Sequence, residues 1–218
     1  MRQNSVKSTS NLSRSKAATW RRNMKSIGIT GGVGSGKTEV LTFITKNYDA
    51  RVIVADIVAK ELEQPGQPCY HKLVEALGKG ILDEEGLIDV KTLAGLIFSD
   101  AKALVQVNAI VHPVVKHYIL GAMEEERKKG TKYFVVEAAL LIEEDYQDIL
   151  DEMWYIYVSE PVRRKRLKES RGYSDQKIDN IMAAQKTDAE FRMVCDHVID
   201  NNDSIEKMQK QVEELLVI

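Results

Sequence analysis

Apolar and polar positions follow two patterns along the chain from residue 24 onward. Short runs rich in Ile and Val predict strands, and longer segments with apolar residues every three or four positions predict helices. The expected strands are Ser26–Thr30, Arg51–Ala55, Tyr133–Glu137, Met153–Val158 and His197–Asp200. Because helical segments separate these strands, we expect right-handed crossovers and a parallel five-stranded sheet with helices on both faces.

The longest segment without a strand pattern lies between the second and third expected strands. It is too long for a simple crossover and it has helical periodicity. Its expected helices are Tyr70–Leu77, Val90–Phe98, Ala101–Val111 and Val114–Lys128. We therefore predict a helical insert at about residues 57–130, over the C-terminal edge of the sheet, where α/β proteins bind ligands. A helix over 37–45 is also expected, and a last one with an apolar stripe at Ile205, Met208, Val212 and Leu215.

Composition narrows the classes of partner. The chain has 218 residues, of which 44% are hydrophobic and 29% charged, and its formal net charge is -2. This balance does not favour a polyanion, so no nucleic-acid partner is expected, and no apolar run approaches the ~20 residues of a membrane span. Cys69 and Cys195 are far apart and form no C-x-x-C pair, which fits a reducing compartment such as the cytoplasm.

Residues 1–23 differ from the rest of the chain. They are rich in Ser and basic residues, and no acidic residue occurs before Glu39. Two interpretations compete, a mitochondrial transit peptide and a disordered extension ahead of the fold. We favour the extension, because the segment lacks a convincing amphipathic pattern, and expect the folded α/β domain to occupy residues 24–218.

A phosphate-binding loop is the strongest chemical motif. The pattern G-x-x-x-x-G-K-[ST] is matched in full by Gly31-Gly32-Val33-Gly34-Ser35-Gly36-Lys37-Thr38. An expected strand precedes the motif and an expected helix follows it, as the P-loop requires. The amides of Gly32 to Gly36 can then converge on ATP phosphates, Lys37 can neutralise them, and the Thr38 hydroxyl can ligate Mg²⁺.

Other nucleotide-binding classes lack their signatures here. The chain contains no Asn-Lys-x-Asp of a GTPase and no His-Arg-Asp or Asp-Phe-Gly of a protein kinase. The sequence Asp83–Gly86 has the Asp-x-x-Gly pattern, but no buried strand leads into it, so we interpret it as a polar turn. Asp56 follows the second strand and has two interpretations, a catalytic carboxylate and an N-cap for the next helix.

Beyond the P-loop, an ordered series of elements resembles the dephospho-coenzyme A kinase family. The resemblance covers Lys25 to the C-terminus. The matching elements are Ile27–Lys37, Asp56 with Pro65-Gly66, Val111-His112-Pro113, Glu137–Glu143, Arg166, Gly172–Ser174, Gln185 and Val198–Asn201. The resemblance implies transfer of the ATP γ-phosphoryl group to the 3′-hydroxyl of dephospho-coenzyme A, with Asp56 accepting the proton and His112 near the acceptor. It also implies a monomer or a small homo-oligomer acting on this small molecule.

The chain departs from the family pattern at three places. Val54 replaces the first Asp of an Asp-Ala-Asp element, and Glu137 and Ala139 stand where Asp and Pro are usual. Glu137 still offers a carboxylate for Mg²⁺. Ser170 occupies the place of the usual lid arginine, so Arg171 beside it is a weaker candidate for a phosphate ligand.

A run of basic residues follows the fourth strand, within an expected lid region at about residues 160–186. The run consists of Arg163, Arg164, Lys165, Arg166, Lys168 and Arg171. Such a run is usually a solvated face, but family resemblance favours a lid over the ATP phosphates, with Arg166 at the γ-phosphoryl group. Two alternatives remain open, a related kinase of a nucleoside or of shikimate, and an ATP-binding regulatory protein without turnover.

Overall fold

The computed structural model describes residues 24–216, which fall into two compact units. Of the described residues, one unit contains 24–52 and 125–216, and the other contains Ile53–Glu124. The expected extension at residues 1–23, including its targeting interpretation, lies outside the described residues. Among the described helices, none is both long enough and apolar enough to cross a membrane.

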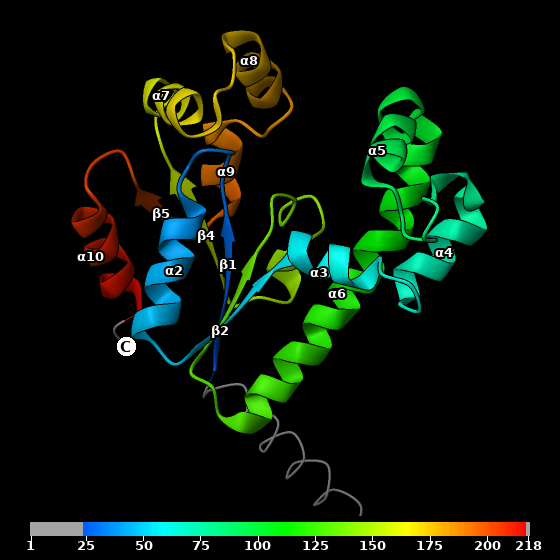
Figure 1. Ribbon diagram of the computed structural model, residues 1–218. Coiled ribbons are helices and arrows are strands. Elements are labelled where there is room, and N and C mark those ends of the chain that lie inside the picture. The colour runs from blue at the N-terminus through cyan, green and yellow to red at the C-terminus, as the bar shows by residue number, and fades with distance from the viewer. Residues whose placement is uncertain (1–23, 217–218) are drawn as a thin grey trace, which may run out of the picture. The chain divides into compact units, whose positions relative to one another are not determined.

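A five-stranded sheet organises the first unit (Figure 1). Its strand order is β2-β3-β1-β4-β5, and the pairs β1–β3, β1–β4 and β4–β5 are parallel. The strands are β1 Lys25–Thr30, β2 Ala50–Val54, β3 Tyr133–Glu137, β4 Glu152–Tyr157 and β5 His197–Asp200. The predicted fold class is confirmed, and the strand boundaries differ from the expected ones by one residue at most.

The central strands are buried on both faces, which explains their continuous apolar sequences. Consecutive residues of a strand point to opposite faces, and Phe134 and Val135 of β3 are both fully buried, as are Met153 and Trp154 of β4. Burying one such side chain contributes about 1.5–3 kcal/mol. Trp154 is completely buried, so it is a core residue and offers no face on which a base could stack.

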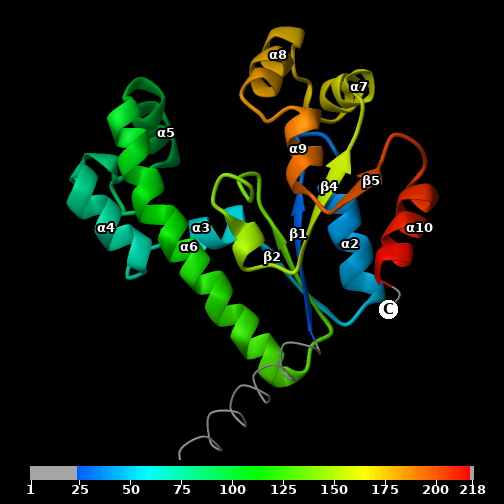
Figure 2. The same cartoon turned by 180° about the vertical axis from the view of Figure 1, so that it is seen from behind.

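Helices cover the two faces of this sheet. In this unit, the helices that follow β1, β4 and β5 are α2 Lys37–Asn47, α7 Glu160–Arg171, α8 Asp175–Ala183, α9 Asp188–Val194 and α10 Ile205–Leu216. Figures 1 and 2 show α2 and α10 together on one face, α9 on the opposite face, and α7 and α8 beyond the ends to which β1 and β4 point. Because these are the carboxyl ends of parallel strands, α7 and α8 lie where ligand sites form in such folds.

The apolar stripe of the last helix differs from the prediction. Met208, Val212 and Leu216 are buried at a spacing of four residues, whereas Ile205 is 55% exposed and Leu215 is half-buried. The stripe therefore runs along i, i+4 positions from Met208, and Ile205, at the first turn, lies beyond the surface that the helix buries.

The second unit is helical and contains a polar turn. Its elements are α3 Ala55–Leu62, α4 Pro68–Leu77, the 3-10 helix η1 Lys79–Ile81, α5 Val90–Ser99 and most of α6 Ala101–Lys129. The turn predicted at Asp83–Gly86 is confirmed, because the Asp83 side chain accepts hydrogen bonds from the amides of Glu85 and Leu87. The functional assignment of this region as an acceptor-binding insert stays a prediction.

The expected helix break at His112-Pro113 is wrong, because α6 continues through Pro113. A proline inside a helix removes a hydrogen bond to the carbonyl four residues earlier and costs ~3 kcal/mol. The apolar stripe of α6 continues on both sides of Pro113, with Val107, Val111, Val115 and Ile119 all buried. Their burial outweighs the local cost, so tertiary packing decides the continuity of this helix.

Candidate active site

The P-loop connects β1 to α2 and has the backbone that its glycines predict. Gly31, Gly34 and Gly36 have φ values of 144°, 84° and 87°, which residues with a Cβ rarely adopt. Gly36 is the N-cap of α2, and no side chain caps this helix end. The loop therefore presents main-chain amides at a helix N-terminus, an arrangement that binds phosphate.

Asn201 fixes the second half of this loop. Its side-chain amide donates a hydrogen bond to the Ser35 carbonyl at 2.8 Å, and its backbone amide donates to Tyr157 at 2.9 Å. A Cβ atom added to Gly36 would lie only 2.2 Å from Asn201 Nδ2. Gly36 is therefore required both for its left-handed conformation and for the close approach of Asn201, which is buried.

Lys37 and Glu137 meet at the start of α2. The Lys37 ammonium lies 3.5 Å from Glu137 Oε1 and donates a 2.8 Å hydrogen bond to the Gly31 carbonyl. Strand register explains the meeting, because Glu137 pairs with Ile29, two residues before the P-loop. The two side chains are 15% and 13% exposed, so the pair is largely shielded from water. The structure thus brings together two residues that the sequence singled out separately.

A lid residue, Arg163, contacts the first half of the P-loop. Its Nε donates to the Val33 carbonyl at 3.2 Å, and its Nη2 donates to Gln185 Oε1 at 2.6 Å. The same Gln185 oxygen accepts a 3.3 Å hydrogen bond from the Val33 amide. Burial against the loop lowers the pKa of Arg163, although the ordinary pKa is so high that the guanidinium stays charged.

Three other basic residues of the predicted lid contact carboxylates of α7 and α8 or the backbone directly after β5. Arg164 pairs with three carboxylates, Glu160, Asp175 and Asp179, and Lys168 Nζ lies 2.7 Å from Asp175. Arg166 donates a 2.8 Å hydrogen bond to the Asn201 carbonyl.

Arg171 is the last residue of α7 and is exposed, with its guanidinium 5.9 Å from the centre of the Tyr173 ring. At the other end of α7, Ser159 occupies the N-cap position, and its side chain makes no capping hydrogen bond.

Asp56 and His112 belong to the second unit. Asp56 is exposed and is the second residue of α3, whose N-cap is Val54, so the interpretation of Asp56 as the N-cap is wrong. Its carboxylate still lies in the first turn, where the helix dipole favours a negative charge. His112 is half-buried within α6.

Metal-binding groups are few. Among the described residues, no cluster of three or more His, Cys, Asp or Glu side chains could hold a metal ion. Thr38 is exposed in the first turn of α2, and Glu137 lies next to Lys37. These two oxygen donors suit an ion that takes most of its ligands from phosphates and water, which is the usual coordination of Mg²⁺.

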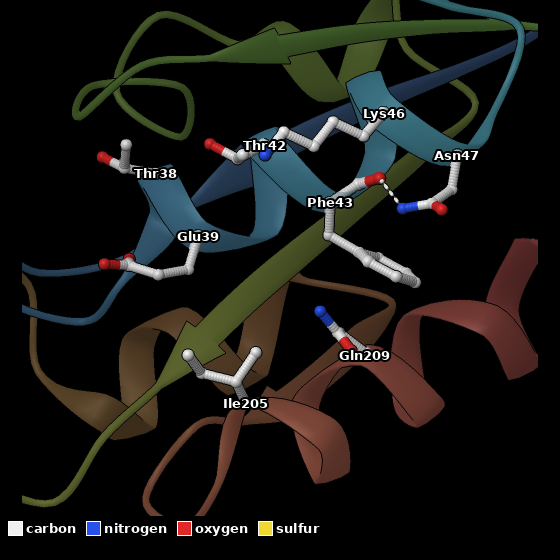
Figure 3. Close-up of a pocket in the computed structure, with 8 residues that line it drawn as sticks. All are labelled: Thr38, Glu39, Thr42, Phe43, Lys46, Asn47, Ile205 and Gln209. Atoms are coloured by element: carbon white, nitrogen blue, oxygen red, sulfur yellow. Dashed lines mark hydrogen bonds between the residues drawn. The ribbon is translucent and has the colours of Figure 1, made fainter.

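A pocket of about 260 Å³ lies between α2 and α10 (Figure 3). Its lining comprises Thr38, Glu39, Thr42, Phe43, Lys46, Asn47, Ile205 and Gln209. Figure 3 shows Thr38 and Glu39 at one end and Asn47 at the other, where Asn47 donates a 2.8 Å hydrogen bond to the Phe43 carbonyl. Ile205 lines this pocket, but none of the P-loop glycines does.

The sequence could have identified Arg163, which we did not single out from the basic run. Leu167 is the one buried residue of α7, and a Cβ atom added to Gly34 would lie 3.0 Å from its side chain. Residues four apart share a helix face, so Arg163 lies on the same face as Leu167 and points to the loop. Gln185 and Asn201 were part of the family resemblance, but no local pattern indicated their contacts with the P-loop, because their partners are distant in sequence.

Comparison with known proteins supports the family suggested by the motifs. A family model described as dephospho-CoA kinase matches residues 25–207. The dephospho-CoA kinase of Geobacter sulfurreducens is 36% identical over 192 residues, which covers 88% of this chain and 97% of that protein. The dephospho-CoA kinase of Carboxydothermus hydrogenoformans is 35% identical over 191 residues, with 87% and 92% covered.

Solved structures resemble this fold over most of its length. A protein from Thermus thermophilus has a TM-score of 0.74 and 26% identity, with 89% of this chain and 97% of that chain covered. The dephospho-CoA kinase of Campylobacter jejuni has a TM-score of 0.66 at 21% identity, with 88% and 94% covered. A shikimate kinase of Bacteroides thetaiotaomicron has a TM-score of 0.54 at 18% identity, with 89% and 99% covered. The last two likenesses bear on the fold alone.

Proposed function

The chain belongs to the dephospho-CoA kinase family, and we propose that it transfers the terminal phosphoryl group of ATP to the 3′-hydroxyl of dephospho-coenzyme A. The products are coenzyme A and ADP, and the reaction completes coenzyme A synthesis. The observation that carries this proposal is the family match over residues 25–207, which includes the P-loop and the lid. The reaction forms a bond from the 3′-oxygen to the γ-phosphorus and breaks the bond from that phosphorus to the β–γ bridging oxygen.

The P-loop supplies the binding of the donor phosphates. Amides from Gly32 to Gly36 stand at the N-terminus of α2, and the Lys37 ammonium is held beside them by the Gly31 carbonyl and Glu137. A negatively charged phosphate oxygen is a better partner for Lys37 than a neutral carbonyl. Lys37 can therefore exchange its Gly31 contact for ATP and stabilise the charge that spreads over the transferring group.

Thr38 and Glu137 are the residues that would hold Mg²⁺. The Thr38 hydroxyl is exposed at the first turn of α2, and the Glu137 carboxylate reaches the same turn through Lys37. When bound, the ion neutralises charge on the β- and γ-phosphates. Glu137 has a further role on this chain, because it orients the Lys37 ammonium.

The acceptor side rests on Asp56 and His112. We assign to Asp56 the acceptance of the 3′-hydroxyl proton, since an exposed carboxylate in the first turn of α3, two residues after β2, can act as a base. His112 is assigned to the acceptor nucleotide on family resemblance. Arg166 is assigned to the γ-phosphoryl group, and Arg171 remains the weaker phosphate ligand because it is exposed at the end of α7.

A panel of acceptors tests the proposed function. ADP release from MgATP should be fast with dephospho-coenzyme A and much slower with adenosine, uridine or shikimate. The pantetheine and diphosphate arms of the preferred acceptor supply binding energy that orients its 3′-hydroxyl. A preference for one of the other acceptors would replace this proposal with a related kinase, and ATP binding without turnover would indicate a regulatory protein.

Location and assembly are part of the proposal. Cys69 and Cys195 are both free thiols, which supports a reducing compartment such as the cytoplasm. We expect a monomer or a small homo-oligomer, which light scattering after gel filtration measures directly.

A further inference from the structure

The contact between Arg163, Gln185 and Val33 has the geometry of a phosphate-binding site with a side-chain oxygen in it. Gln185 Oε1 accepts one hydrogen bond from the Val33 amide of the P-loop and a second from the Arg163 guanidinium, at 3.3 Å and 2.6 Å. A loop amide and an arginine are also the pair of donors that a phosphate oxygen takes at such loops. The Gln185 oxygen thus accepts hydrogen bonds from two donors, the Val33 amide and the Arg163 guanidinium, that are also suited to bind a phosphate oxygen.

The Arg163 side chain contacts the P-loop backbone at two residues, Gly32 and Val33. A Cβ atom added to Gly32 would lie 2.4 Å from Arg163 Nη2, 2.6 Å from its Cζ and 2.8 Å from its Nη1. The guanidinium therefore lies directly against the Gly32 backbone. Its Nε hydrogen bond to the Val33 carbonyl adds a second anchor on the loop.

The remaining basic residues of α7 are engaged elsewhere. Arg164 and Lys168 are paired with carboxylates of α7 and α8, and the Arg166 hydrogen bond goes to the Asn201 carbonyl. Lys165 is largely exposed and lies 4.0 Å from Glu169. Within the described part of the lid, Arg163 is thus the cation whose hydrogen bonds are made to the P-loop and to a neutral side chain.

We infer that Arg163 is a phosphate-binding residue of the lid, and that Gln185 is a positioning residue that occupies a phosphate-oxygen position until ATP displaces it. This inference rests on the proposed function for its ligand, the triphosphate of ATP. On binding, the Val33 amide passes from Gln185 to a phosphate oxygen, and Arg163 Nη2 exchanges a neutral acceptor for an anionic one. Hydrogen bonds to charged acceptors are about twice as strong as neutral ones, so the exchange favours ATP.

Gln185 also connects this exchange to the lid. It follows α8, whose C-cap is Ala184, and precedes α9, which begins at Asp188. Release of its side chain from Val33 removes a hydrogen bond between this connection and the loop. The same residue therefore holds Arg163 over the loop in the nucleotide-free protein and yields its position when phosphate arrives.

Calorimetric titration of the full chain with ATP and with AMP tests the assignment of Arg163. AMP lacks the β- and γ-phosphates that a P-loop holds, so it reports on other contacts. Arg163→Gln should weaken ATP binding by about 10- to 100-fold, the range expected for one hydrogen bond to a charged group, and leave AMP binding unchanged. Arg163→Lys, which keeps the charge, should lose less. Lys165→Gln is the matched control on the same helix and should bind both nucleotides as the wild type does.

Two variants of Gln185 separate a displaceable occupant from a structural residue. Gln185→Glu keeps the shape and the acceptor oxygen but makes the occupant anionic, so ATP should bind at least tenfold more weakly, with no change for AMP. Gln185→Met removes the hydrogen bonds and should bind ATP at least as tightly as the wild type, with a lower kcat because Arg163 is less well held.

The inference is overturned if Arg163→Gln binds ATP normally, if Gln185→Glu behaves as the wild type, or if Gln185→Met weakens ATP binding tenfold. These titrations contain no acceptor. A wild-type protein that binds ATP with the expected variant effects but does not phosphorylate dephospho-coenzyme A would therefore refute the proposed function and leave this inference standing.

Discussion

The Lys37 ammonium, at the first residue of α2, lies 3.5 Å from Oε1 of Glu137, the last residue of β3. Two residues that are distant in sequence thus form a largely buried ion pair at the P-loop. Removal of one partner of such a pair is costly, because it leaves the other charge buried and unpaired. The roles of Lys37 and Glu137 in turnover can therefore be tested by substituting each residue in turn.

Lys37→Ala should lower kcat by at least about 10²-fold, because it removes a preorganised charge from the transferring phosphoryl group. The fold should persist, with an unchanged far-UV spectrum. Lys46→Ala, in the last turn of the same helix, is the control and should retain activity. Near-normal ADP release by the Lys37 variant would contradict the P-loop assignment.

Glu137→Gln should raise the Mg²⁺ concentration needed for half-maximal turnover by about 10–100-fold, the usual range when a group that orients a metal site is changed. The measurement is a Mg²⁺ titration at fixed ATP, with chelation by EDTA as the zero point. Glu169→Gln, an exposed carboxylate of α7, serves as the control. If the variant loses kcat at every Mg²⁺ concentration with no shift in the midpoint, Glu137 acts only by orienting Lys37.

Glu152→Gln should change the dependence of stability on pH. Burial raises the pKa of Glu152, but hydrogen bonds from Lys25 and the Trp154 indole, with the charges of Lys25 and His197, outweigh it and lower the pKa below 4.5. A lowered folded-state pKa contributes stability above the unfolded pKa, and this contribution is lost as the pH falls through the folded pKa.

The expected loss in the Glu152 variant is therefore about 1 kcal/mol in the free energy of unfolding near pH 7. The difference from the wild type should shrink as the pH falls below 4.5, which urea titrations at several pH values measure. Glu214→Gln, at an exposed position of α10, provides the comparison. A difference that stays constant down to pH 3 would mean that lost packing, rather than the charge of Glu152, causes the effect.

The strands could be predicted because their sequences carry the signal locally. Phe134 and Val135 point to opposite faces of the sheet and are both fully buried, so a continuous apolar run marks β3 directly. Pro113 gave the wrong answer for the opposite reason. A proline favours the end of a helix. The buried packing of Val111 and Val115 keeps α6 continuous, and this packing cannot be read from the local sequence.

The site divides in the same way. The P-loop is contiguous, so its residue types and its spacing identify Lys37 and Thr38 without any tertiary information. Asn201 and Gln185 act on the loop from more than a hundred residues away, through hydrogen bonds to Ser35 and Val33. No periodicity or propensity predicts such contacts. Arg163 is an intermediate case. It is on the same face of α7 as Leu167, so it could be predicted once that face was known to lie against the P-loop.

The last prediction concerns Asp56. The structure contradicts its interpretation as an N-cap, and the catalytic interpretation stays a prediction. Asp56 is inside the first turn of α3 and does not cap it, so Asp56→Asn removes a charge from a helix N-terminus. That loss costs about 0.3–1 kcal/mol, and melting curves should show at most this destabilisation. Glu61→Gln, at an exposed position near the other end of α3, controls for a change of charge on the same helix.

Turnover should respond far more strongly than stability. Asn cannot accept the proton of the 3′-hydroxyl, and general bases typically contribute ~10²–10⁴-fold. Phosphoryl transfer is often loose, so the proton can leave late, and the loss should then fall near the lower end of that range. ATP affinity should change much less, because the P-loop supplies most phosphate contacts. A folded Asp56→Asn protein with wild-type turnover would exclude Asp56 as the base, and the acceptor proton would then have to leave through another group.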